Sequence, residues 1–224
     1  MEEPLKYFLE RTTPFGTLAR IQRQRQLRKK FRKWQQDGAV GAMPNLGKQQ
    51  VVIDYIKKFS PEILIETGTY KGKMIYAVMP HIDRIYSIEL DETHYQNARR
   101  RFAGYPDIHI LQGQSGEVLP QILKSIHEPC LFWLDAHYSG GSTAKGDIET
   151  PIMQEMECIL NHPRVEDHII LIDDANCFVG EKDYPALETL EQRVRQTRPH
   201  WVFEVVNDII RTHADRGPVH ESRE

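Results

Sequence analysis

The chain has 224 residues, of which 40% are hydrophobic and 27% are charged. This length suits one α/β domain with a short extension and is too small for two enzymatic domains. The composition is that of a soluble globular protein, and we expect no membrane-spanning helix and no secretory signal. The three scattered cysteines match neither a disulfide framework nor a zinc site. A reducing cytoplasm is therefore the expected location.

The net charge of −3 is distributed unevenly along the chain. Residues 1–33 contain ten Lys and Arg against three Asp and Glu, whereas the rest of the chain contains 19 against 29. An acidic body argues against nucleic acid as a partner, because phosphate backbones are bound by clustered basic side chains. Any polyanion would have to bind the N-terminal arm.

Residues 20–33 predict a basic helix, since eight of these fourteen residues are basic and none is acidic. Leu27, Phe31 and Trp34 follow the spacing i, i+4, i+7 and share one helical face. Two interpretations stay open. The helix packs these apolar side chains on the domain while water solvates its charges, or it binds an acidic surface, a polyanionic polymer or an acidic partner chain. The second would place the protein at the periphery of a membrane surface.

Residues 37–47 are rich in Gly and Pro and mark a linker or a loop on the substrate side. Short hydrophobic runs then alternate with helix-like segments, which implies a parallel sheet covered on both faces. The last two runs are joined only by Asn207-Asp208, too short for a crossover, so this pair must be antiparallel. The expected strands are residues 63–66, 84–89, 108–112, 131–135, 168–173, 201–206 and 209–212, and the expected helices are 73–80, 92–102, 115–126, 149–160 and 184–197.

This pattern predicts an α/β fold with a doubly wound, seven-stranded Rossmann-like sheet that ends in an antiparallel hairpin. Residues 1–47 form a basic helical extension and linker, residues 48–214 form the catalytic domain, and residues 215–224 form a flexible tail. A nicotinamide-binding sheet normally stays parallel throughout, so the hairpin argues against that class. The oligomeric state stays open, a homo-oligomer included.

In an open parallel sheet, a ligand binds beyond the carboxyl ends of the strands, where the strand order reverses. The first strand ends in a turn that contains Glu66, Gly68, Thr69, Tyr70 and Gly72. Its glycines allow the backbone to turn tightly and to approach a ligand. The spacing E-x-G-x-x-x-G differs from the G-x-G-x-x-G of dinucleotide-binding folds, which disfavours a pyrophosphate.

The second and third strands also end in polar side chains. Glu89 follows Glu66 by 23 residues, and its carboxylate can accept both hydroxyls of a ribose and would repel a ribose phosphate. The alternative is a surface acid that caps the next helix. After the third strand, Gln114 can hydrogen-bond an adenine edge, while Ser115 can cap the following helix or add a donor.

From about residue 62 to residue 212, the chain resembles the class I S-adenosylmethionine-dependent methyltransferases. The resemblance lies in the order of these motifs at three successive strand ends and in the closing hairpin, and the N-terminal sixty residues are outside it. It implies that S-adenosylmethionine is the cofactor, with its methionine end near the first strand. The cofactor-binding residues that it implies are Glu66, Gly68, Thr69, Tyr70, Gly72, Glu89, Gln114, Ser115 and Asp135.

Three carboxylates follow the fourth and fifth strands, namely Asp135, Asp173 and Asp174. Packed together without a cation they would repel one another, and a hard divalent ion such as Mg²⁺ would relieve that repulsion. The arrangement resembles the metal-dependent O-methyltransferases of the catechol and macrolide-sugar types, which implies these three residues as magnesium ligands. The alternative is that Asp135 only orients the cofactor and the other two cap the next segment.

His137 is the leading candidate for the base that removes a hydroxyl proton, because its ordinary pKa is near neutrality, and Lys145 is the second. The alternative for His137 is a turn histidine bonded to the backbone. Residues 138–147, rich in Gly and Ser, are expected to form a mobile lid.

We therefore expect transfer of a methyl group to a hydroxyl of a small polar acceptor, a sugar or a glycosylated natural product, with help from a divalent metal. One alternative is transfer without a metal, with His137 as base. The other is a binding module that has no activity and is tethered by its basic helix.

Overall fold

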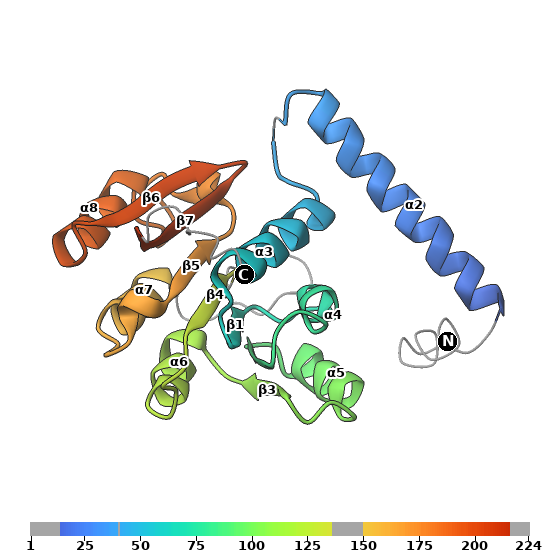
Figure 1. Cartoon of the computed structure of the whole chain (residues 1–224), viewed down its shortest axis with the longest axis horizontal. Helices are drawn as coiled ribbons and strands as arrows, with labels where there is room; N and C mark the ends of the chain where they lie inside the picture. The colour runs from blue at the N-terminus through green and yellow to red at the C-terminus, as the bar shows by residue number, and fades with distance from the viewer. Residues whose placement is uncertain (1–13, 40, 136–149, 216–224) are drawn as a thin grey trace, which may run out of the picture.

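The computed structural model describes residues 14–39, 41–135 and 150–215. A seven-stranded sheet with the order β3-β2-β1-β4-β5-β7-β6 forms the centre of the domain (Figure 1). β1 to β5 are parallel, and β6 and β7 form the predicted antiparallel hairpin. β7 also pairs with β5 in the antiparallel direction. The strands are β1 (Ile63–Thr67), β2 (Arg84–Glu89), β3 (Ile108–Gln112), β4 (Cys130–Leu134), β5 (Ile169–Ile172), β6 (Trp201–Val206) and β7 (Ile209–Ala214).

Helices cover both faces of the sheet: α3, α4 and α5 lie on one side and α6, α7 and α8 on the other (Figure 1). α6 ends before the expected residue 126. The helices are α2 (Pro14–Gln36), α3 (Asn45–Phe59), α4 (Lys73–Val78), α5 (Glu92–Phe102), α6 (Ser115–Leu123), α7 (Ile152–Leu160) and α8 (Leu187–Thr197), with short 3₁₀ turns η1 (Val165–Asp167) and η2 (Ala175–Cys177).

The central strands are buried on both faces, because successive side chains of a strand point to opposite sides of the sheet. In β1, Ile63 and Ile65 pack in the core shared with α6, α7 and α8. Leu64, between them, packs in the core shared with α3, α4 and α5. This double burial is the reason that the strands read as continuous hydrophobic runs in the sequence.

The terminal hairpin has the turn that its sequence predicts. Asn207 and Asp208 have φ angles of 54° and 67°, as in a type I′ turn, whose twist matches that of the flanking strands. The turn is tied to the segment after β5, since the Asn176 backbone N–H and side-chain amide donate to the Asp208 carboxylate at 2.8 and 2.9 Å. These bonds fix the path of the chain as it leaves the carboxyl end of β5.

Helix α3 was not among the expected helices. Its buried residues Val52, Tyr55 and Ile56 have the spacing of a helix, so the sequence contained a signal for it. The signal was missed because the preceding residues were assigned to a linker. The helix begins at Asn45, so the boundary drawn after residue 47 falls within its first turn. α3 packs its apolar face on the sheet and thereby brings its N-terminal turn to the edge where the predicted site lies.

The expected helix over residues 184–197 is shorter than predicted and begins at Leu187. Ala186, the residue directly before it, has an extended backbone with φ −62° and ψ 147°, and it pairs with Val179 in an isolated antiparallel bridge. An extended residue cannot be part of a helix, so α8 starts only after Ala186.

Helix α2 projects beyond the domain and is attached near its C-terminal end (Figure 1). Phe31 and Trp34 stack with ring centroids 5.8 Å apart, and Trp34 Nε1 donates to the Gly41 carbonyl oxygen at 3.3 Å. A Cβ atom on Gly47 would lie 2.6 Å from the Phe31 ring, which shows how closely the two helices approach. The structure thus places Phe31 and Trp34 on the side of α2 that packs on the domain.

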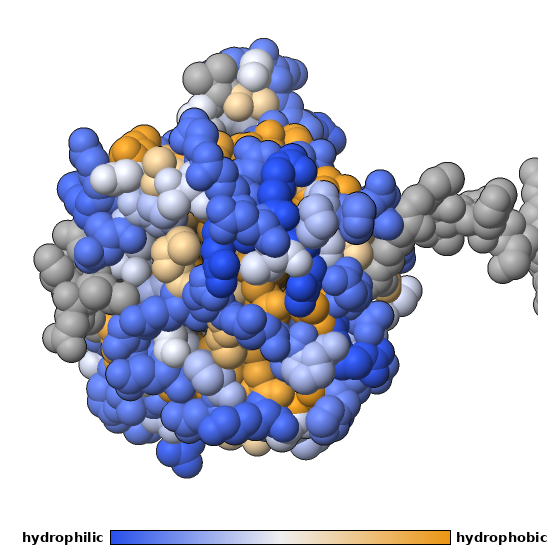
Figure 2. All heavy atoms as spheres, turned by 90° about the vertical axis from the view of Figure 1, so that its left-hand side faces the viewer, coloured by the Kyte–Doolittle hydropathy of each residue, from blue (hydrophilic) through white to orange (hydrophobic). Residues whose placement is uncertain are grey.

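The surface is largely polar. Figure 2 shows a face on which hydrophilic side chains surround smaller apolar areas. Among the described residues, the exposed large hydrophobic side chains are Tyr70, Val179 and Val205. Within the same part of the chain, every helix is too short or too polar to cross a bilayer.

The packing of α8 on the sheet predicts the effect of truncating Leu190, which is fully buried. We expect Leu190→Ala to lower the free energy of unfolding by about 2–5 kcal/mol, because it removes apolar contacts and leaves a cavity. Gln192→Ala, on the exposed side of the same helix, should change it by less than about 0.5 kcal/mol. Urea unfolding followed by circular dichroism measures both, and equal losses would contradict this packing.

Candidate active site

The turn after β1 requires residues that tolerate left-handed backbone conformations. Gly68 and Gly72 have φ angles of 90° and 60°, and Tyr70 between them has 45°. A Cβ atom on Gly72 would also lie 2.7 Å from the Phe102 ring. A side chain at this position would therefore both strain the backbone and displace α5.

A chain of buried hydrogen bonds stabilises the turn after β1. Thr69 Oγ1 lies 2.6 Å from Ser87 Oγ, which donates to Glu66 Oε2 at 2.5 Å. Burial raises the pKa of Glu66 to about 8; the Ser87 bond opposes this shift, and the neighbouring carboxylates of Asp135 and Glu89 add to it. At neutral pH, Glu66 therefore holds a proton and can donate as well as accept a hydrogen bond.

Glu89 is held at the end of β2 by backbone donors. Its Oε2 accepts from the Tyr70 N–H at 2.6 Å, and its Oε1 accepts from the Asp91 N–H at 2.9 Å. The cap of α5 is instead Asp91, whose side chain accepts from the His94 N–H at 2.8 Å. The structure thus assigns the capping role to Asp91 and leaves the Glu89 carboxylate at the edge of the turn.

The segment after β3 differs in one respect from its expected role. Gln114 occupies the N-cap position of α6 without a side-chain cap bond, and Ser115 is the first helical residue. Ser115 therefore does not cap the helix. Its buried hydroxyl instead interacts with the buried carboxyl group of Glu155 in α7.

Glu155 is a further buried acid that the sequence reasoning missed. Burial raises its pKa to about 7, the hydroxyls of Ser115 and Thr67 oppose this shift, and the charge of Asp135 adds to it. A signal was present: Ile152, Glu155 and Met156 follow the spacing i, i+3, i+4, which places an acid within an apolar stripe.

Asp135, Asp173 and Asp174 meet at the carboxyl ends of β4 and β5. Each offers one oxygen, and these atoms lie within 4.8 Å of one another. The backbone positions them: the Asp135 N–H donates to the Thr67 carbonyl oxygen at 3.1 Å, and the Asp173 N–H to the Leu134 carbonyl oxygen at 3.0 Å. Burial raises the pKa of Asp173 to about 7, and the charges of the other two carboxylates contribute.

Lys48 of α3 supplies a positive charge to this cluster, which the sequence reasoning did not foresee. Its Nζ lies 2.5 Å from Asp173 Oδ2 and 3.1 Å from Asp174 Oδ1. Burial alone would lower the pKa of Lys48, but the carboxylates of Asp173, Asp174 and Asp135 raise it above its usual value. The ammonium group is therefore permanently charged.

A cavity of about 220 Å³ connects these features. It is lined by the N-terminal turn of α3, the turn after β1, the start of α4 and the end of β4. Lys48, Glu66, Gly68 and Asp135 all contribute to its wall. The predicted cofactor turn and Asp135 of the acidic cluster thus line one cavity at the edge of the sheet.

No family model and no curated protein matches the sequence. Solved structures do match the fold, among them methyltransferase PaMTH1 of Podospora anserina bound to SAH, with 13% identity, 87% of this chain and 86% of that chain covered, and a TM-score of 0.56. The chain has the class I methyltransferase fold. An O-methyltransferase of Bacillus cereus in complex with SAH matches at 16% identity, with 74% of this chain and 79% of that chain covered and a TM-score of 0.54. TomG of Streptomyces achromogenes, an O-methyltransferase in complex with SAM, matches at 15% identity, with 83% and 87% covered and a TM-score of 0.54.

In this methyltransferase fold, the strand order reverses between β1 and β4, and the predicted residues lie on both sides of that point. Glu66, Glu89 and Gln114 follow the adjacent strands β1, β2 and β3, and Asp135 follows β4. The structure therefore brings the predicted cofactor residues to one edge of the sheet. Their individual contacts with a cofactor stay predictions.

Several predicted features lie outside the described residues. These are the base candidates His137 and Lys145, the loop over residues 138–147, the expected helix start at residue 149, and residues 216–224 of the tail. The roles predicted for them stay predictions.

The buried acid Glu155 predicts a pH dependence of stability. Its pKa is raised from 4.5 to about 7 in the folded chain, so the native state binds this proton more tightly than the unfolded state, and stability falls as pH rises through this range. We expect Glu155→Gln to be more stable than the unsubstituted chain at pH 8, by up to about 3 kcal/mol, with little difference below pH 5. Urea unfolding at both pH values tests this, with the exposed Glu188→Gln as control. A gain that is the same at both pH values would contradict it.

Proposed function

We propose that the chain is a methyltransferase that transfers the methyl group of S-adenosylmethionine to a hydroxyl of a small polar acceptor, a sugar or a glycosylated natural product. One observation carries the proposal: the predicted cofactor turn and the cluster of Asp135, Asp173 and Asp174 border the same edge of the sheet. Similar structures such as TomG are O-methyltransferases, which supports oxygen as the methylated atom.

The described residues fit S-adenosylmethionine. Glu89 presents a carboxylate for the ribose hydroxyls at the end of β2. Gln114, which is expected at the adenine, makes no side-chain cap bond to α6. Glu66 and Gly68 line the cavity, where the methionine end is expected. When bound, the cofactor supplies a sulfonium whose methyl group is open to attack by a nucleophile.

The protein must hold the acceptor hydroxyl in line with that methyl group and remove its proton. A bond forms between the hydroxyl oxygen and the methyl carbon as the bond from sulfur to that carbon breaks. The hydroxyl proton passes to a base, for which His137 is the leading candidate and Lys145 the second. In this proposal Asp135 serves both the cofactor and the reaction centre.

The carboxylate cluster also fits a divalent cation. Carboxylate oxygens are the hard ligands that Mg²⁺ takes, and one oxygen from each of the three residues lies within 4.8 Å of the others. We propose that Asp135, Asp173 and Asp174 hold this ion. A bound Mg²⁺ would act as a Lewis acid that lowers the pKa of an acceptor hydroxyl.

Lys48 favours a second candidate, methyl transfer without a metal. Its ammonium already contacts two of the three carboxylates, so the cluster has a resident cation within the chain. In that case His137 would act as base without a metal, and the acids would orient the acceptor through hydrogen bonds to its hydroxyls.

Magnesium titration separates the two candidates. After chelation and dialysis, we expect release of S-adenosylhomocysteine with sugar acceptors to drop at least tenfold and to recover as Mg²⁺ is added back. Asp174→Asn should weaken this recovery, because a neutral amide is a weaker ligand for Mg²⁺. Turnover that is unchanged after chelation would reject the metal and favour the second candidate.

The assignment of Glu89 to the ribose predicts a difference between two neighbouring acids. Glu89→Ala should weaken binding of S-adenosylmethionine at least tenfold, because charged hydrogen bonds are lost, whereas the exposed Glu92→Ala should leave it unchanged. Titration calorimetry measures both, and thermal unfolding without ligand checks that the variants are folded. Equal effects would contradict the assignment, and no binding by the unsubstituted chain at millimolar ligand would favour a binding module without activity.

A further inference from the structure

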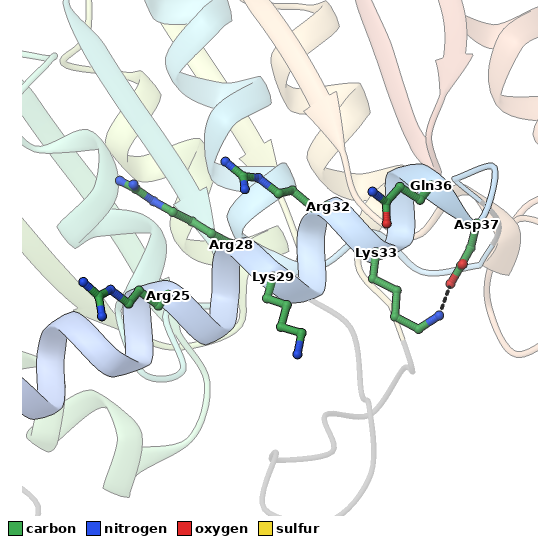
Figure 3. Close-up of a pocket in the computed structure, with 7 residues that line it drawn as sticks. All are labelled: Arg25, Arg28, Lys29, Arg32, Lys33, Gln36 and Asp37. Carbon is green, nitrogen blue, oxygen red and sulfur yellow. Dashed lines mark hydrogen bonds and ion pairs between the residues drawn. The ribbon is translucent and has the colours of Figure 1, made fainter.

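The basic face of α2 is a surface formed by Arg25, Arg28, Lys29, Arg32 and Lys33 (Figure 3). All five side chains are exposed. At about 100° of rotation per residue, the five positions span an arc of roughly 140° on the helix. They therefore form one continuous surface.

This face lies opposite the side of α2 that packs on the domain. Phe31 and Trp34 project about half a turn away from the centre of the basic face. Their contacts with Gly41 and Gly47 fix the rotation of the helix about its axis. The basic face is therefore held outward.

Most of the five cations lack an acidic partner in the described part of the chain. Lys33 pairs with Asp37 at 2.7 Å, and no other ion pair to this face occurs among the residues that the structure describes. Arg25 with Lys29 and Arg28 with Arg32 are like charges at i and i+4, an arrangement that destabilises a helix. A solvated helix normally intersperses acids between its bases, so this face has the charge pattern of a surface for an anionic partner.

We propose that the basic face of α2 binds an anionic polysaccharide, a single sugar chain that carries carboxylate, sulfate or phosphate groups. Cations that recur at each helical turn, about 5.4 Å apart, match anionic groups that recur along such a chain. The inference rests on the proposed function, because it makes the acceptor a hydroxyl of the bound polymer. It thereby narrows the acceptor class from any sugar to an anionic glycan.

Other polyanions fit this surface less well. The chain after residue 33 carries 29 acids against 19 bases, so a wide anionic surface, such as a bilayer or a nucleic acid duplex, would also meet an acidic body. A helix that lies in a membrane inserts its apolar face, but Phe31 and Trp34 pack on the protein. The basic face has no aromatic side chain on which the bases of a single nucleic acid strand could stack.

The test compares three probes of similar charge: an oligogalacturonate, a single-stranded oligonucleotide, and vesicles that contain phosphatidylserine. We expect the full chain to bind the oligogalacturonate at least tenfold more tightly than the other two, with an affinity that falls as salt rises. Arg28→Gln with Arg32→Gln should weaken that binding at least tenfold. Lys57→Gln with Lys124→Gln, at exposed positions on the body, removes the same charge and should change it less than twofold.

Circular dichroism confirms that α2 is retained in the variants. Equal effects of the two double variants, or tighter binding of the oligonucleotide or the vesicles, would overturn the inference. Methyl transfer to a monosaccharide separates it from the proposed function. If that activity is present but the oligogalacturonate does not bind, this inference alone fails. If the polymer binds through α2 but no acceptor is methylated, the surface stands and the proposed function fails.

Discussion

Repulsion among carboxylates at one edge of the sheet is the constraint on which this structure depends. Backbone hydrogen bonds between the buried strands hold Asp135 and Asp173 at neighbouring strand ends, and Asp174 directly follows Asp173. Packing such charges is unfavourable without a partner, and Lys48 provides one from α3. Helix α3 therefore stabilises the sheet in two ways, through its apolar contacts and through the charge of Lys48. The same negative charge is what would attract a divalent cation or the hydroxyls of an acceptor.

On the cofactor side of this edge, buried polar groups are held in fixed positions by hydrogen bonds. Ser87 links Thr69 to Glu66 in a buried chain, and Glu89 is fixed by two backbone donors. The raised pKa of Glu66 keeps it protonated near neutrality, which limits the total charge beside the acidic cluster. A turn built in this way needs little reorganisation when a ligand binds.

The fold was predictable because its pattern is local: buried strands read as apolar runs, and a two-residue turn can only join antiparallel neighbours. The acids at the strand ends were predictable too, since parallel strands deliver their carboxyl ends to one edge. Lys48 was not, because its partner Asp173 lies 125 positions away in the sequence and only the packing of α3 brings them together. The capping role, one of the two roles predicted for Ser115, was wrong because its helix begins one residue earlier than a side-chain cap would require.

The basic N-terminal segment and the acidic body of the chain lie in different parts of the structure. Part of the charge of the acidic body lies at the sheet edge, where Lys48 of α3 pairs with Asp173 and Asp174. The bases of α2 do not take that place, because Phe31 and Trp34 orient the helix so that its basic face is exposed. A protein that only needed to neutralise its own acids would pair them with these bases. Because the acids and these bases are not paired, the protein has two sites of opposite charge. The acidic site suits hydroxyl groups together with a cation, and the basic face of α2 suits anionic groups. An acceptor that carries hydroxyl groups and anionic groups would use both sites.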